Sequence, residues 1–177
     1  NDYLKKLTPF NRKQALDQFF VKSGIKLSDS TLKLLQDNSR GVEQIIRSGL
    51  QQGKSYAQMA KDIKQQYNKI GKRAETIART EGHRIMNATE FEAWQASGAE
   101  GERYIISTLD GRTRSQSASM DGQRENEFNL FEYPNGATAF YPGNSGVAGY
   151  DINDRETVGY DLDGIDPDTR QARPPVK

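Results

Sequence analysis

The sequence predicts an α+β fold, in which an N-terminal helical region of about four to five helices precedes a small, loop-rich β region. Residues 72–97 contain no proline and are followed by Gly98, which is typical of a long helix with a glycine stop. After Gly98 the helical periodicity ends, and the β-branched residues of segment 104–109 predict a strand that leads into an Asp-Gly turn. We therefore place the change from helix to strand at Gly98.

Three helices are predicted before this long helix. The first covers residues 9–24, which follow the capping residue Thr8 and begin with Pro9 at the first helical position. A second helix is expected over residues 28–50, with a break at Gly41. Apolar residues at helical spacing predict a third over residues 56–67, after a serine N-cap.

The region after the first strand is expected to be irregular. Residues 112–120 are rich in serine and arginine and predict a loop or a short helix. Residues 128–141 alternate aromatic and polar side chains around two prolines, which favours irregular or edge-strand structure. One more short strand is expected over residues 157–160, followed by an acidic and then extended tail over residues 161–177.

Composition restricts the chemistry that is available to the chain. Hydrophobic residues make up 34% of the 177 residues and the mean hydropathy is −0.87, so we expect a thin core and some surface that needs a partner. The absence of cysteine excludes disulfides and thiolate metal sites, and His83 is the only histidine. No apolar run is long enough to cross a membrane, and no signal-peptide pattern is present. Because the sequence begins at Asn1 rather than Met, we interpret it as a fragment or a processed form.

The small net charge of +1 hides a strong division of charge along the chain. Residues 1–98 contain 17 Lys and Arg against 10 Asp and Glu, and residues 99–177 contain 8 against 14. The basic half and the acidic half are suited to docking on each other. Alternatively, the basic half faces an acidic partner such as DNA, in which case its field is screened by salt.

The long predicted helix carries an acid on its apolar face. At 100° per residue, Glu81 falls in the middle of a stripe of alanine and isoleucine residues. A carboxylate in such a stripe must be paired or hydrogen-bonded. Two explanations remain open, because Glu81 either closes a structural salt bridge or, together with Arg84, binds the second half of the chain or a partner.

Three blocks of the sequence carry a family resemblance. They are residues 77–87, which read I-A-R-T-E and continue to an arginine and an asparagine, residues 109–122, which read L-D-G-R-T-R and end in M-D-G, and residues 152–157, which read I-N-D-R-E-T. In this order and spacing they resemble the phage minor head proteins of the Mu F type, also called head-morphogenesis proteins. The motif residues for which we expect structural roles are Arg79, Thr80, Glu81, Arg84, Asn87, Asp110, Arg112, Arg114, Asp121, Gly122, Asn153, Asp154, Arg155 and Glu156.

The sequence departs from the family pattern where that pattern suggests a metal site. Family members often carry a histidine in the second block and two cysteines in the third, and these positions correspond here to Ser117, Asp154 and Glu156. Thiolate zinc binding is therefore excluded, and we expect no metal and no cofactor. We expect instead that Arg112, Arg114 and Arg155 form ion pairs with Asp110, Asp121, Asp154 or Glu156. The cost of Arg155→Ala then depends on burial, being large for a buried network and small for an exposed one.

The resemblance implies a division of the chain and a role. It divides the sequence into an N-terminal helical region over residues 1–52, a Mu F-like minor head domain over residues 53–160 and the tail. It implies a minor, non-enzymatic structural component of a phage head, made in the host cytoplasm and located in the capsid interior. Such a protein binds the portal complex or the inner capsid surface and assists head assembly or the handling of packaged DNA. Non-specific contact with DNA is a separate hypothesis, which rests on the excess of basic residues in residues 1–98.

A toxin-like enzyme carried by a phage particle is the alternative. Mono-ADP-ribosyltransferases use an arginine, a Ser-Thr-Ser strand and a Glu-x-Glu motif. The chain offers Arg79 or Arg103, then Ser107 and Thr108, then residues 125–127, although Leu109 replaces the last serine. A nuclease is a second enzyme of this kind.

Overall fold

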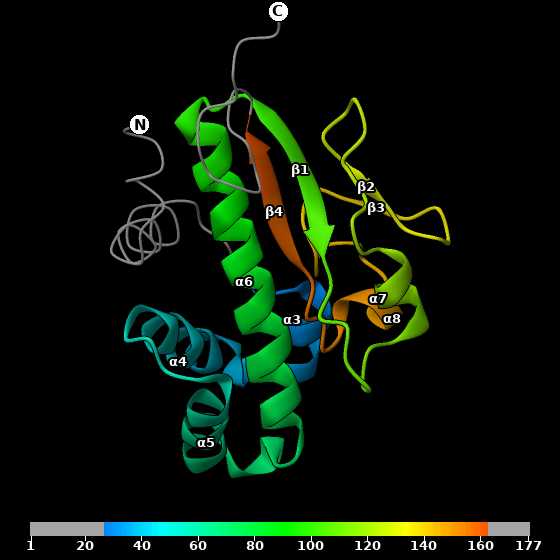
Figure 1. Cartoon of the computed structure of the whole chain (residues 1–177). Helices are drawn as coiled ribbons and strands as arrows, with labels where there is room; N and C mark the ends of the chain where they lie inside the picture. Colours follow the sequence, from blue (N-terminus) through cyan, green and yellow to red (C-terminus); the bar gives the residue numbers. More distant parts are fainter. Residues whose placement is uncertain (1–26, 163–177) are drawn as a thin grey trace, which may run out of the picture. The chain divides into compact units, whose positions relative to one another are not determined.

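The computed structural model describes residues 27–162, so the helix expected over residues 9–24 and most of the predicted tail lie outside the described part (Figure 1). The chain separates into two compact units between Ala93 and Trp94, here called the helical unit and the β unit. Helices precede short antiparallel strands, which confirms the predicted α+β class. The boundary predicted near residue 53 rests on the family resemblance and stays a prediction.

The helical unit contains helices that pack around a single apolar core. Its elements are α3 (Asp29–Leu35), the 3-10 helix η2 (Gln36–Asn38), α4 (Ser39–Gln51), α5 (Tyr56–Gln66), the 3-10 helix η3 (Asn68–Ile70) and α6 (Arg73–Ser97), the last of which continues into the β unit. The fully buried members of the core are Val42, Ile46, Met59, Ile63, Ala74 and Ala78. Their helical spacing explains why the apolar pattern predicts these helices correctly.

The predicted break at Gly41 is wrong, because this glycine lies inside α4. The interruption falls earlier, at η2, where Gln36 has a positive φ of 47° and ends α3. Gly41 serves packing instead, since a Cβ atom at this position would overlap the hydroxyl of Tyr67. The sequence shows a glycine but not the aromatic ring that requires it.

The β unit combines two small antiparallel sheets with two short helices. Its elements are β1 (Gly101–Ile106), α7 (Ser115–Ser119), β2 (Phe131–Glu132), β3 (Thr138–Ala139), α8 (Ala148–Asp151) and β4 (Thr157–Leu162). Strand β1 pairs with β4, and β2 pairs with β3. The core of the unit consists of Ile105, Met120, Phe131, Tyr133, Ala139 and Val158.

Strand β1 begins three residues before its predicted start and ends before Leu109, which is 63% exposed. The inward positions of the strand are Arg103 and Ile105, both of them buried. An arginine at an inward position is not expected from residue type alone, which is why the strand was predicted too late. The segment 128–141 is irregular apart from the two-residue strands β2 and β3, and α8 was not predicted.

No helix within residues 27–162 is long and apolar enough to cross a membrane.

Candidate functional site

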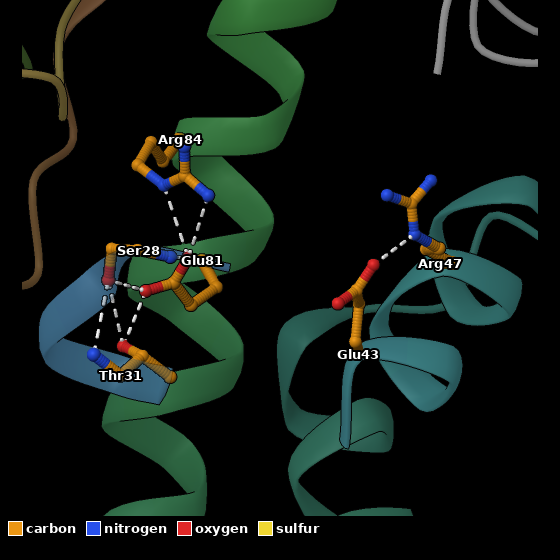
Figure 2. A network of polar contacts seen from close by, with 6 residues as sticks. All are labelled: Ser28, Thr31, Glu43, Arg47, Glu81 and Arg84. Carbon is orange, nitrogen blue, oxygen red and sulfur yellow. Dashed lines mark hydrogen bonds and ion pairs between the residues drawn. The ribbon is translucent and has the colours of Figure 1, made fainter. Parts of the chain in front are cut away.

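The carboxylate of Glu81 is the centre of a buried polar cluster in the helical unit (Figure 2). Glu81 is fully buried, and Arg84, one turn later on α6, donates to its Oε2 from Nε at 3.1 Å and from a terminal nitrogen at 3.0 Å. The backbone N–H of Ser28 donates to the same oxygen at 3.0 Å. The hydroxyls of Ser28 and Thr31 donate to Oε1.

These contacts join the start of α3 to the middle of α6, across 50 or more residues of sequence. Ser28 is the N-cap of α3, and its side chain also accepts a hydrogen bond from the backbone N–H of Thr31. A charged side chain that is removed from water requires such a complete set of partners. The explanation that Glu81 closes a structural salt bridge therefore accounts for its burial.

The other residues of the first block have different environments. Asn87, Thr80 and Arg84 are buried, with exposed fractions of 2%, 9% and 8%. Arg79 lies on the surface of α6, where it forms an ion pair with Glu75 at 2.9 Å. The block is therefore mainly a structural part of α6, with Arg79 at its solvent-facing edge.

Replacing Ser28 by alanine is expected to lower the free energy of unfolding by about 1–2 kcal/mol, because α3 loses its cap and Glu81 loses a donor. Ser55→Ala is the matched control, since Ser55 caps α5 through an exposed capping box with Gln58 and contacts no buried acid. Urea unfolding followed by circular dichroism measures both. Equal losses for the two variants would contradict a role of Ser28 in holding Glu81.

A second buried ion pair lies in the β unit. Arg103 is 0% exposed, and its guanidinium donates to Oε2 of Glu125 at 2.9 and 2.7 Å. The same guanidinium donates to the backbone carbonyls of Phe140 and Asn129, each at 2.8 Å, and its carbon lies 5.3 Å from the ring centroid of Phe131. Arg103 thus ties β1 to the irregular segment that follows residue 124.

The second and third blocks meet through Asp110 and Arg155. The Arg155 guanidinium donates to both carboxylate oxygens of Asp110, at 2.7 and 2.9 Å. This bidentate bond, together with the backbone N–H of Arg112, holds the pKa of Asp110 well below its usual range. The side chain of Arg112 approaches the same acid only to 3.8 Å and is 82% exposed. The network at this position is therefore a surface network.

Arg114 and Asp121 do not take part in the predicted ion pairs. Within residues 27–162, Arg114 forms no ion pair with a carboxylate but donates to the backbone carbonyls of Gly149, Tyr150 and Ile152. These carbonyls lie at the end of α8, where helical carbonyls lack helical partners. Asp121 accepts instead from the backbone N–H of Ser107 at 2.8 Å, beside a turn in which Gly122 has a φ of 74°.

Asp154 and Glu156 form a buried pair of acids rather than ion pairs with arginine. Both are 3% exposed, and the backbone N–H of Glu156 donates to Oδ1 of Asp154 at 3.1 Å. Oδ2 of Asp154 is buried and has no hydrogen-bond partner among residues 27–162. Burial raises the pKa of Asp154 to about 7, and burial together with the charge of Asp154 raises the pKa of Glu156 to about 7. The pair is therefore poised to retain a proton near neutral pH.

The turn before this pair is set by Asn153, which has a positive φ of 54°. Ser117 hydrogen-bonds to Glu156 from the other block. The predicted motif residues are thus divided among a buried helical cluster, a surface pair and a buried acidic pair, each with its own local contacts.

Comparison with known proteins matches residues 40–147 to the family described as Phage Mu protein F like protein. The chain belongs to this family. The match begins in α4 and ends immediately before α8, so it includes Glu81, Arg103 and Asp110. Residues 152–157 follow the matched range.

Two curated relatives are each 31% identical to this Mu F-like chain. The NAD(+)–arginine ADP-ribosyltransferase EFV of Enterococcus faecalis (strain ATCC 700802 / V583) aligns over 155 residues, which is 84% of this chain and 31% of the relative. The minor head protein GP7 of Bacillus phage SPP1 aligns over 130 residues, which is 72% of this chain and 42% of the relative. The chain thus spans less than half the length of either relative. No solved structure matches it.

Family membership and the minor head protein relative support a structural role in a phage head. They also confirm the resemblance that the three sequence blocks indicated. The family and this relative place the Mu F-like chain among proteins of bacteriophage head morphogenesis.

The three positions at which the Mu F-like pattern suggests a metal site are close together in this structure. Ser117 contacts Glu156, and Glu156 contacts Asp154. A hydroxyl and two carboxylates with raised pKa values lack the thiolate and imidazole ligands that zinc prefers. Among the described residues, no three His, Cys, Asp or Glu side chains are arranged to hold a metal ion. The residues present therefore do not fit a zinc site.

Two parts of these clusters were not found from sequence. Ser28 and Thr31 lie outside all three blocks, although their N-cap pattern was visible. Arg103 and Glu125 were considered only as transferase residues. The alternation of inward and outward residues along β1, which places Arg103 on the inward side, could have indicated its structural role. Both cases depend on contacts between segments that are distant in sequence.

Proposed function

We propose that this protein is a non-enzymatic component of a phage head that binds the portal complex or the inner capsid surface. In this role it assists head assembly or the handling of packaged DNA. The observation that carries the proposal is the family match over residues 40–147, together with the similarity to a minor head protein. A position in the capsid interior and synthesis in the host cytoplasm belong to the same proposal.

The exposed apolar side chains of the β unit support a partner-binding role. Five large apolar residues of this unit are at least 43% exposed, namely Ile106, Leu109, Phe128, Phe140 and Ile152. The backbone around two of them is held rigidly, because Arg103 binds the carbonyls of Phe140 and Asn129. A rigid backbone lowers the entropy cost when an exposed aromatic side chain docks in a partner. We infer that Phe128 and Phe140 contribute to binding the portal or capsid surface.

The enzymatic alternative is not favoured. Arg103 and Glu125 bind each other in the interior, and Arg79 is paired with Glu75, so these candidate transferase residues have other partners. The hydroxyl of Ser107 donates to the carbonyl of Ser117 at 2.7 Å. The similarity to an ADP-ribosyltransferase covers only 31% of that enzyme.

The test is co-purification of this protein with a portal protein of the same phage and with assembled heads. We expect association that is lost in the Phe128→Ser/Phe140→Ser variant and retained in Leu34→Ser, which removes an exposed apolar side chain of the helical unit. Circular dichroism confirms that all three proteins are folded. Failure of the unaltered protein to associate with portals or heads would reject the proposal.

A further inference from the structure

One corner of the helical unit carries a dense group of positive charges. Residues 61–73 contain five basic side chains and a single acid, Asp62. The five are exposed, and within residues 27–162 none of them forms an ion pair; they are Lys61, Lys64, Lys69, Lys72 and Arg73, here called the basic corner. Asp62 does not neutralise them, because it binds Lys54 at 2.9 Å.

Three other arginines of the same unit are neutralised by acids. Arg47 binds Glu43, Arg79 binds Glu75 and Arg84 binds Glu81, each at 2.8–3.0 Å. In the basic corner, like charges are concentrated, and no acid among residues 27–162 forms an ion pair with them. Such an arrangement costs free energy through repulsion unless an anion is bound.

The five residues lie on consecutive elements, from α5 through η3 to the start of α6. Lys61 and Lys64 lie one turn apart on α5, away from the core residues Met59, Ala60 and Ile63. The chain then turns through η3, which contains Lys69, and through Gly71, which has a φ of 52°. Lys72 follows, and α6 begins at Arg73. The positive end of the α6 dipole adds to the same field.

We propose that the basic corner binds the phosphate backbone of double-stranded DNA without sequence preference. Four of the five residues are lysines, which act as point charges toward phosphate, whereas base recognition requires side chains in a groove. No large apolar residue within positions 61–73 is exposed, and lysine is depleted in the cores of protein interfaces. Both observations favour a polyanion over an acidic protein. The inference extends the proposed head role, but it is tested on the purified chain alone.

The experiment measures fluorescence anisotropy of two duplexes of unrelated sequence with the full chain between 50 and 200 mM salt. We expect equal affinity for both duplexes and a steep loss of affinity with salt, because each phosphate contact releases counterions. Lys69→Ser/Lys72→Ser should weaken binding roughly tenfold and lower the slope of log K against log salt by about two. Both changes are at exposed positions outside the core.

The matched control is Lys33→Ser/Arg40→Ser, which removes the same charge from exposed positions outside the basic corner. It should change affinity much less than the Lys69 and Lys72 pair. An equal loss of DNA affinity in both double variants would show that only net charge matters. It would overturn the assignment of DNA binding to the basic corner. Salt-independent binding, preference for one sequence or binding to polyglutamate but not DNA would also overturn it. Association with heads is measured separately, so either proposal can fail while the other stands.

Discussion

Replacing Arg103 by alanine is expected to destabilise the β unit by about 3–5 kcal/mol. The substitution removes the two hydrogen bonds that the guanidinium donates to Oε2 of Glu125, whose side chain is only 7% exposed. It also leaves the carbonyls of Asn129 and Phe140 without their donor and removes the cation beside Phe131. Because the Glu125 side chain is almost fully buried, water compensates poorly for the loss of its partner.

The single tryptophan makes this loss measurable in the β unit. Trp94 lies with its ring centroid 4.8 Å from that of Tyr160 on β4, so its fluorescence reports the integrity of this strand. Urea unfolding followed by this signal should show a much lower midpoint for Arg103→Ala. Arg124→Ala is the control, because Arg124 is 50% exposed and its ion pairs with Glu102 and Asp161 lie at the surface. If the Arg103→Ala variant were as stable as the Arg124→Ala variant, the structural role of Arg103 would be contradicted.

The stability of the β unit is expected to fall as pH rises from 5 to 8. The folded-state pKa values of Asp154 and Glu156, both about 7, lie above the ordinary values of 3.8 and 4.5. The stabilisation is therefore fully present below about pH 4 and is lost as the pair ionises through pH 7. One pKa unit corresponds to about 1.4 kcal/mol, and since the two acids share their titration we expect roughly 2–4 kcal/mol in total.

The charged groups around Asp154 and Glu156 do not reverse this fall of stability with rising pH. Asp151 and the buried Tyr133 also face it, while Arg114 partly offsets the negative charge. The pKa of Asp110 is lowered and that of Tyr133 is raised, so these two groups titrate outside the window from pH 5 to 8. The acids at positions 154 and 156 should therefore dominate the pH dependence of the β unit.

Thermal unfolding of the Asp154→Asn variant tests this expectation. Asparagine keeps the acceptor for the Glu156 N–H and removes one of the two acids, so the variant should be more stable than the unaltered protein at pH 8 and less dependent on pH. Glu127→Gln, at an exposed position, should leave the pH profile unchanged. A flat profile for the unaltered protein, or stability that increases between pH 5 and 8, would contradict the assignment.

The helical unit was largely predictable because its signals are local. The apolar spacing of residues 56–67 and 72–97 places α5 and α6 almost at their observed ends. The same spacing places Glu81 on the buried face of α6. The β unit was less predictable, since its strands are short and the start of β1 contains an inward-facing arginine, a residue type that does not indicate a buried strand position.

The sequence by itself determined the α+β class, the position of the long helix, the burial of Glu81 and, through its three blocks, the family. Only the tertiary structure decided the polar partners. It showed that Ser28 and Thr31 complete the site of Glu81, that Arg103 is buried against Glu125, and that Asp154 and Glu156 contact each other instead of arginine. The physical reason is that helical periodicity is a property of neighbouring residues. The choice of a partner for a buried charge depends instead on which distant segments converge and on which groups they remove from water.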